Sequence, residues 1–159
     1  MALKGDRYEL QTDVSYFMNE VAERGGVVTL AASSTPSGAA MDSAANVVTY
    51  VANPSGKVAI GILLNDMVNL DLTRQHINWH KDEIQKGGKV TVLRKGYVLT
   101  NKISGTGTPA AGDKAYVADS GLISTSTRAV ALDAGAVAIG RFLTAKDADG
   151  YAKVEINLP

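Results

Sequence analysis

The chain contains no cysteine. This absence excludes disulfide bonds, cysteine-ligated metals and a cysteine nucleophile, so packing or partners must stabilise the fold. Basic and acidic residues are equal at 16 each, so no net charge attracts nucleic acid or an anionic membrane. The sequence also lacks any apolar run of about 18 residues, the length that a membrane-spanning helix needs. Its first residues lack the hydrophobic stretch that is typical of a signal peptide. We therefore expect no nucleic-acid partner, no membrane span and no signal peptide.

Aromatic residues are scarce as well, at one Trp, six Tyr and two Phe among 159 residues. Small residues are abundant instead, with 22 Ala, 16 Gly, 12 Thr and 10 Ser. Enzymes gather polar and aromatic side chains around a pocket, whereas this composition favours close-packed strands and many turns. Because the length fits a single domain, the composition indicates one compact body that packs against neighbours.

Short apolar runs recur from Gly25 onward and are separated by turn residues. The predicted strands are Val27–Ala32, Val47–Ala52, Lys57–Leu64, Lys89–Arg94, Tyr97–Ile103, Lys114–Ala118, Arg128–Leu132, Ala136–Thr144 and Ala152–Leu158. Lys95 and Gly96 predict a tight turn between two of these strands, and Asp149 with Gly150 predicts a hairpin before the last. Regularly spaced short strands with little helical periodicity predict a mainly β fold, either a small β-barrel or a β-sandwich.

The first 24 residues differ from the rest because they are rich in charge. Four apolar residues among them fall at the helical spacing i, i+3, i+4 and i+7, namely Val14, Phe17, Met18 and Val21. Asp13 is placed to cap a helix and Gly25 to end it. We therefore predict an N-terminal extended arm and short helix in residues 1–24, followed by a β domain in residues 25–159. The helix either packs on its own domain or docks on a neighbouring subunit.

Residues 51–64 and 130–143 echo each other at a constant offset of 79, with eight identities in 14 positions. Both copies contain Val-Ala-Ile-Gly in their last strand, at residues 58–61 and 137–140. We expect two equivalent strands whose valine and isoleucine side chains are buried, namely Val58, Ile60, Val137 and Ile139. The closing glycine of each copy is expected either to form a bulge or to admit another backbone closely.

A polar insert at residues 65–88 interrupts the β pattern and holds both histidines and the only tryptophan. We expect either a helix or an ordered loop, and an insert of this length is usually functional. His76 and His80 would share one helix face with Glu83, as metal ligands do. The metalloprotease pattern needs a glutamate directly after the first histidine, where this chain has Ile77. We therefore predict no metal site, and Trp79 is either a contact anchor or a core residue.

No other motif predicts catalysis or a cofactor. Residues 107–114 resemble a phosphate loop but lack its closing Gly-Lys-Ser/Thr and the helix that follows. Residues 147–150 resemble the opening of a calcium loop, but Leu158 stands where the bidentate acid is required. No Gly-x-Ser-x-Gly turn is present. We therefore expect that the protein is not an enzyme.

Four segments carry a resemblance to a known family, namely Pro109–Val117, Gly121–Ile123, Val137–Leu143 and Asp149–Leu158. Their Gly-Asp-Lys-x-Tyr turn, Val-x-x-Gly-Arg strand and closing strand are similar to the head decoration (cement) proteins of tailed bacteriophages. The resemblance implies a small β-barrel or sandwich domain in the virion, on the outer capsid surface. It also implies binding to the major capsid protein, commonly as a homotrimer, and a stabilising structural role.

The candidate interface residues lie in the N-terminal segment and in the insert. They are Tyr8, Tyr16, Phe17, Met18, His76, Trp79 and His80. Aromatic side chains are enriched at the energetically important centres of interfaces. Two alternatives stay open: another virion part, such as a head-fibre base or a tail protein, and a carbohydrate-binding β module. A sugar-binding module usually stacks its ligand on several exposed aromatics, and this chain offers few.

Overall fold

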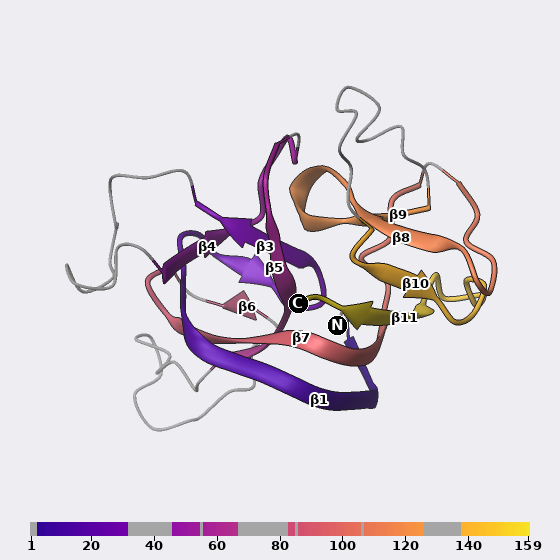
Figure 1. Ribbon diagram of the computed structural model, residues 1–159, viewed down its shortest axis with the longest axis horizontal. Coiled ribbons are helices and arrows are strands. Elements are labelled where there is room, and N and C mark those ends of the chain that lie inside the picture. The colour runs from indigo at the N-terminus through magenta and orange to yellow at the C-terminus, as the bar shows by residue number, and fades with distance from the viewer. Residues whose placement is uncertain are drawn as a thin grey trace.

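The computed structural model describes residues 3–31, 46–54, 56–66, 83–84, 86–105, 107–125 and 138–159. These residues are mainly β, as predicted (Figure 1). The strands are β1 (Leu3–Met18), β2 (Ala22–Glu23), β3 (Val27–Leu30), β4 (Val47–Thr49), β5 (Ala59–Asp66), β6 (Glu83–Ile84), β7 (Lys89–Thr100), β8 (Lys114–Val117), β9 (Ile123–Ser124), β10 (Gly140–Phe142) and β11 (Ala152–Asn157). A 3₁₀ turn, η2, covers Asp119–Gly121.

One nine-stranded sheet contains all but two of these strands. Its order is β1-β4-β3-β5-β7-β11-β10-β8-β9, and β1 also pairs with β7. The pairings therefore close a circuit through β1, β4, β3, β5 and β7, while β11, β10, β8 and β9 continue from β7. Figure 1 shows these two groups of strands, with β1 and β7 running beside each other below them. The short strands β2 and β6 form a separate two-stranded sheet.

Strand β7 joins the two groups because it has three neighbours. One of its edges pairs with β1 from Thr100 to Lys89, while its other edge pairs first with β5 and then with β11. Lys95 and Gly96 lie within this strand, so the predicted tight turn between two strands is wrong. Pairing on both edges outweighs the local turn preference of glycine. Gly96 has a φ of +140°, and a Cβ there would collide with the backbone oxygen of Tyr8.

The helix predicted from Val14 to Arg24 is also wrong, since β1 extends to Met18 and β2 follows a turn. The backbone of β1 pairs with β7 along its length and with β4 at its end. β-Branched and aromatic residues in this stretch favour a strand once such partners exist. Asp13, predicted as a helix cap, instead accepts hydrogen bonds from the backbone N and Oγ of Ser15 at 2.9 and 2.5 Å. Residues 3–24 therefore contribute strands to the fold.

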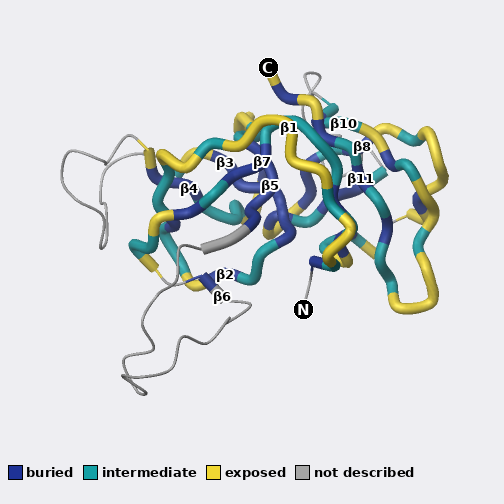
Figure 2. The backbone as a smooth tube through the Cα atoms, turned by 90° about the horizontal axis from the view of Figure 1, so that it is seen from below, coloured by how far each residue is buried: buried dark blue, intermediate teal, exposed yellow. Residues whose placement is uncertain are grey.

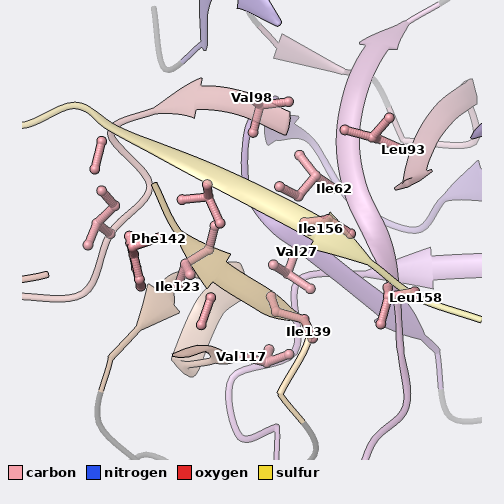
Figure 3. Close-up of a cluster of buried hydrophobic side chains, with 14 of the residues drawn as sticks. Val27, Ile62, Leu93, Val98, Val117, Ile123, Ile139, Phe142, Ile156 and Leu158 are labelled. Atoms are coloured by element: carbon pink, nitrogen blue, oxygen red, sulfur yellow. The ribbon is translucent and has the colours of Figure 1, made fainter. Parts of the chain in front are cut away.

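Two clusters of buried hydrophobic side chains form the core. The larger lies where the two groups of strands meet, and Figure 3 shows Ile62, Leu93, Phe142 and Ile156 converging in it. The smaller contains Met18 of β1 and residues of β2 to β7. Neighbouring residues of one strand point to opposite faces, so Ile62 and Leu93 enter the larger cluster while the residues beside them enter the smaller. β5 and the part of β7 that pairs with it are therefore covered on both faces.

Tyr50 fastens β4 to the connection between β2 and β3. Its Oη donates a hydrogen bond to the backbone oxygen of Glu23 at 2.6 Å and accepts one from Gly26 N at 3.1 Å. The ring lies so close to Gly26 and Gly121 that a Cβ at either position would collide with it. Glu20 accepts a hydrogen bond from Tyr50 N at 2.7 Å. Burial of the phenol raises the pKa of Tyr50, so the hydroxyl keeps the proton that it donates.

The expected role of the two repeated glycines is confirmed. A Cβ at Gly61 would collide with the backbone oxygen of Leu93, and a Cβ at Gly140 would collide with that of Glu155. Each glycine therefore admits a neighbouring strand at close range. The pairing of β3 with β5 also shifts register next to Gly61, between Val28 and Thr29.

The burial expected from the same repeat is confirmed only in part. Ile139 is fully buried and Ile60 is half-buried, but Val58 is 71% exposed. The prediction for Val58 is wrong because β5 begins at Ala59, so Val58 precedes the paired residues. Val137 and the predicted strand Arg128–Leu132 lie outside the described residues.

We predict that Gly96→Ala destabilises the protein by about 1–3 kcal/mol, because the new Cβ meets the Tyr8 backbone in a strained conformation. Gly5→Ala is the matched control, since Gly5 lies on β1 with no atom within 4 Å of an added Cβ. Its unfolding free energy should change by less than about 0.5 kcal/mol. Urea denaturation measures both values, and equal stability of the two variants would contradict the close contact.

We predict that Ile139→Ala costs about 2–5 kcal/mol of unfolding free energy, because a fully buried side chain leaves a cavity. Val58→Ala, at the exposed position of the other repeat, should cost less than about 0.5 kcal/mol. Thermal and chemical denaturation of the two variants check this difference. A similar loss in both would show that the repeats are buried alike.

Candidate functional site

Strand β1 carries exposed apolar side chains on the surface of the protein. Tyr8 is 54% exposed, Leu10 66% and Val14 49%. Figure 2 shows most of the β1 backbone as exposed or half-buried, in contrast to the buried course of β5. We call Tyr8, Leu10 and Val14, together with Tyr97 of β7, the β1 surface. Tyr8 and Val14 are six residues apart on a strand, so this surface is roughly 20 Å long.

Register shifts explain why β1 exposes these residues. Between Leu3 and Phe17 its pairing with β7 shifts four times, and Leu10 is the extra residue between Glu9 and Gln11. Val14 lies in another shift, between Asp13 and Tyr16. A bulged residue leaves the regular alternation of the strand. The bulges therefore turn two large apolar side chains toward solvent.

The outer edge of β1 has little strand pairing among the described residues. This edge pairs with β4 only at Phe17 and Met18. Over residues 3–16, β1 pairs with β7 on its other edge, and the described residues provide no strand for the outer edge. Bulges and charged side chains on an edge discourage the addition of another strand. Asp6, Arg7, Glu9 and Asp13 supply such charges on β1. These bulges and charges therefore disfavour the pairing of another strand with this edge.

Tyr8 stacks on Tyr97 of the neighbouring strand. The ring centroids lie 5.9 Å apart with an interplanar angle of 27°. The ammonium group of Lys153, on β11, lies 3.9 Å from the centroid of the Tyr97 ring and 3.1 Å from a carboxylate oxygen of Asp6. The hydrogen bond from Lys153 to Asp6 raises the pKa of the lysine. Three strands thus meet at one aromatic pair, in which Tyr8 is exposed and Tyr97 is half-buried.

A second ion pair fastens the start of β1 to the β10–β11 hairpin. Lys4 Nζ lies 3.0 Å from Asp147 Oδ2, 3.8 Å from Asp149 Oδ2 and 4.1 Å from the centre of the Tyr151 ring. Backbone N–H groups of Tyr151 and Asp149 donate to Asp147 Oδ1 and close the hairpin loop. The Tyr151 hydrogen bond, followed by that from Lys4, holds the pKa of Asp147 below its usual value. Residues 147–150 therefore form the expected turn.

The other predicted interface residues of β1 lie closer to the core. Tyr16 is half-buried and packs against the smaller cluster, and Phe17 is half-buried at the pairing with β4. Met18 is 1% exposed and belongs to that cluster, so its side chain faces the protein interior. Tyr8 is therefore the most exposed of the four. The interface role of these residues stays a prediction.

The predicted interface residues of the insert lie outside the described residues, namely His76, Trp79 and His80. Only its margins are described. Asp66 of β5 pairs with Val90, and β6 pairs with β2 through Ile84 and Ala22. The described parts of the chain hold no group of three or more potential metal ligands. In those same parts, no helix has the length and apolar character needed to cross a membrane.

The ion pairs of Lys4 and Lys153 were missed at the level of sequence. Lys4 and Asp147 are 143 residues apart, and Asp6 and Lys153 are 147 apart. The sequence around a single charged residue does not indicate which distant residue of opposite charge will pair with it. Only the repeated pairing across β1, β7 and β11 brings them together.

Comparison with known proteins identifies the family. A search of curated proteins found no match. A family model described as structural cement protein (E217 gp24/Pam3 gp6) matches residues 13–157, which leaves residues 3–12 of β1, including Tyr8 and Leu10, outside the match. A cement protein of this kind belongs to the phage virion and stabilises its capsid. This mainly β chain is therefore a member of the phage structural cement protein family.

Proposed function

We propose that the protein binds the major capsid protein on the outer surface of the phage capsid, and that the β1 surface makes this contact. The observation that carries the proposal is the set of exposed apolar side chains on β1, with Tyr8 at 54% and Leu10 at 66% exposure. Aromatic residues that become buried on association contribute strongly to binding. Membership of the cement family supports the capsid as the partner, because a capsid cement protein binds the capsid.

The arrangement of the strands supports a rigid structural role without a catalytic step. We propose that the closed circuit of β1, β4, β3, β5 and β7 is a small β-barrel that holds β1 in place. A preformed surface loses less conformational entropy on binding than a free arm does. Binding only to the assembled capsid stabilises that assembly by mass action.

We also propose that three copies of the chain associate. The resemblance to head decoration proteins implies a homotrimer, and the chain offers a second exposed apolar contact apart from β1. Thr29 pairs with Ala59, so the exposed Leu30 and Val58 are the next positions along the same antiparallel pair of strands. A cyclic trimer needs two different surfaces that meet. Leu30 with Val58 provides one such surface.

We predict that Tyr8→Ser weakens capsid binding by about thirtyfold, or about 2 kcal/mol, as expected for a central aromatic contact. Val21→Ser is the matched control, because Val21 is 57% exposed but lies beyond the end of β1. Its binding should stay within about twofold of the original chain. Occupancy of purified capsids that lack the protein is measured against concentration, and thermal unfolding confirms that both variants remain folded.

Point substitutions are the appropriate test here because deletion of residues 1–24 would remove a strand that pairs with β7 and β4. Unchanged capsid binding by folded Tyr8→Ser, and by the double variant that adds Leu10→Ser, would overturn the docking role of β1. An equal loss of capsid binding in Val21→Ser would show that the effect is not specific to the β1 surface.

The proposed trimer predicts a mass of three chains, each of 16.6 kDa, when intact protein is released from capsids and weighed under native conditions. Cross-linking of protein still bound to capsids gives an independent count. A single chain mass in both measurements would contradict the trimer and leave the capsid contact of β1 unaffected.

A further inference from the structure

Four side chains from three strands form a connected cluster on the outer face of the sheet. Asp6 and Tyr8 belong to β1, Tyr97 to β7 and Lys153 to β11. Lys153 Nζ contacts both Asp6, at 3.1 Å, and the Tyr97 ring, at 3.9 Å, while Tyr97 stacks on Tyr8 at 5.9 Å. Lys153 is thus joined to Tyr8 by two routes, one through Asp6 along β1 and one through the Tyr97 ring.

The strand register places these side chains on one face. Tyr97 pairs with Tyr8 on one side and with Glu155 on the other. Lys153 lies two residues before Glu155, and residues two apart on a strand share a face. On the same face, Arg141 of β10 pairs with Glu155, and its Nε lies 2.6 Å from Glu155 Oε2. The charged groups beside the aromatic pair are therefore paired with each other.

The start of β1 needs such support. Between Leu3 and Arg7, β1 has two more residues than the stretch of β7 with which it pairs. Regular backbone pairing is interrupted there, and the described residues give this part of β1 no second strand neighbour. Side-chain contacts must therefore fix its position. Those of Lys4 and Lys153 fasten it to the β10–β11 hairpin.

We infer that Lys153 is a positioning residue for capsid binding, which holds the Tyr8–Tyr97 pair in the geometry that docks on the capsid. This inference rests on the proposed docking role of Tyr8. The ammonium is attracted both to the carboxylate of Asp6 and to the electron-rich face of Tyr97. A surface that is already ordered binds more tightly because less freedom is lost on association. Lys153 therefore acts through Tyr8 without being its partner on the capsid.

The test compares Lys153→Met with Lys153→Arg in the full-length protein. The methionine variant keeps much of the aliphatic length but loses the charge, and should bind capsids about threefold to tenfold more weakly. The arginine variant keeps a cation that can pair with the carboxylate of Asp6 and stack on the ring of Tyr97. Its capsid affinity should therefore stay within about twofold of that of the original chain. Lys114→Met is the matched control, since Lys114 is exposed on β8 and pairs with β10. It should bind as the original chain does.

Amide hydrogen exchange of the free protein gives a second measurement that does not depend on the capsid. Lys153→Met should speed exchange of residues 6–10 and leave exchange in β5 unchanged, whereas Lys114→Met should alter neither. Faster exchange together with weaker binding, both reversed by Lys153→Arg, supports the inference. A uniform rise in exchange across the protein would indicate general destabilisation and overturn it.

The outcome also separates this inference from the proposed function. If Tyr8→Ser weakens capsid binding but Lys153→Met does not, the positioning role is overturned and the docking role of β1 stands. If neither variant weakens binding, the docking role is overturned and the positioning role with it.

Discussion

Strand β7 pairs with three other strands, and these pairings hold the whole fold together. One edge of β7 pairs with β1, and the other is divided between β5 and β11. Both groups of strands are therefore hydrogen-bonded to one 12-residue strand. The larger core lies where these groups meet, and Gly96 allows β1 to approach β7 closely. This pairing positions most of β1, while the ion pairs of Lys4 and Lys153 fasten its irregular start.

The exposed face of β1 combines order with apolar character. Bulges turn Leu10 and Val14 outward, and the stacking of Tyr8 on Tyr97 holds the exposed Tyr8 ring against a neighbouring strand. The neighbouring charges form ion pairs within the chain, such as Lys153 with Asp6 and Arg141 with Glu155. A surface of this kind suits a protein that must bind an existing assembly, because its own strands are ordered before contact.

The sequence predicted the general character of the fold but not the path of β1. Alternating short strands and turn residues correctly indicated a mainly β body, and the repeated glycines at Gly61 and Gly140 correctly indicated close strand approach. The helical spacing near Val14 was misleading because bulges also place apolar residues at irregular intervals. Local turn chemistry at Gly96 was misleading too, since pairing on both edges of β7 keeps the chain extended there.

Sequence alone indicated the hairpin turn at Asp149 and Gly150, most of the strands, the lack of cysteine chemistry and the resemblance to capsid cement proteins. These properties depend on residues that are near one another in the chain, or on composition alone. The folded chain was needed to show that β1 is a strand, that Met18 is in the core and that Tyr8 is exposed. The partners of β1 lie far away in sequence, in β7 and β11, and hydrogen bonds and ion pairs across such separations leave no local pattern.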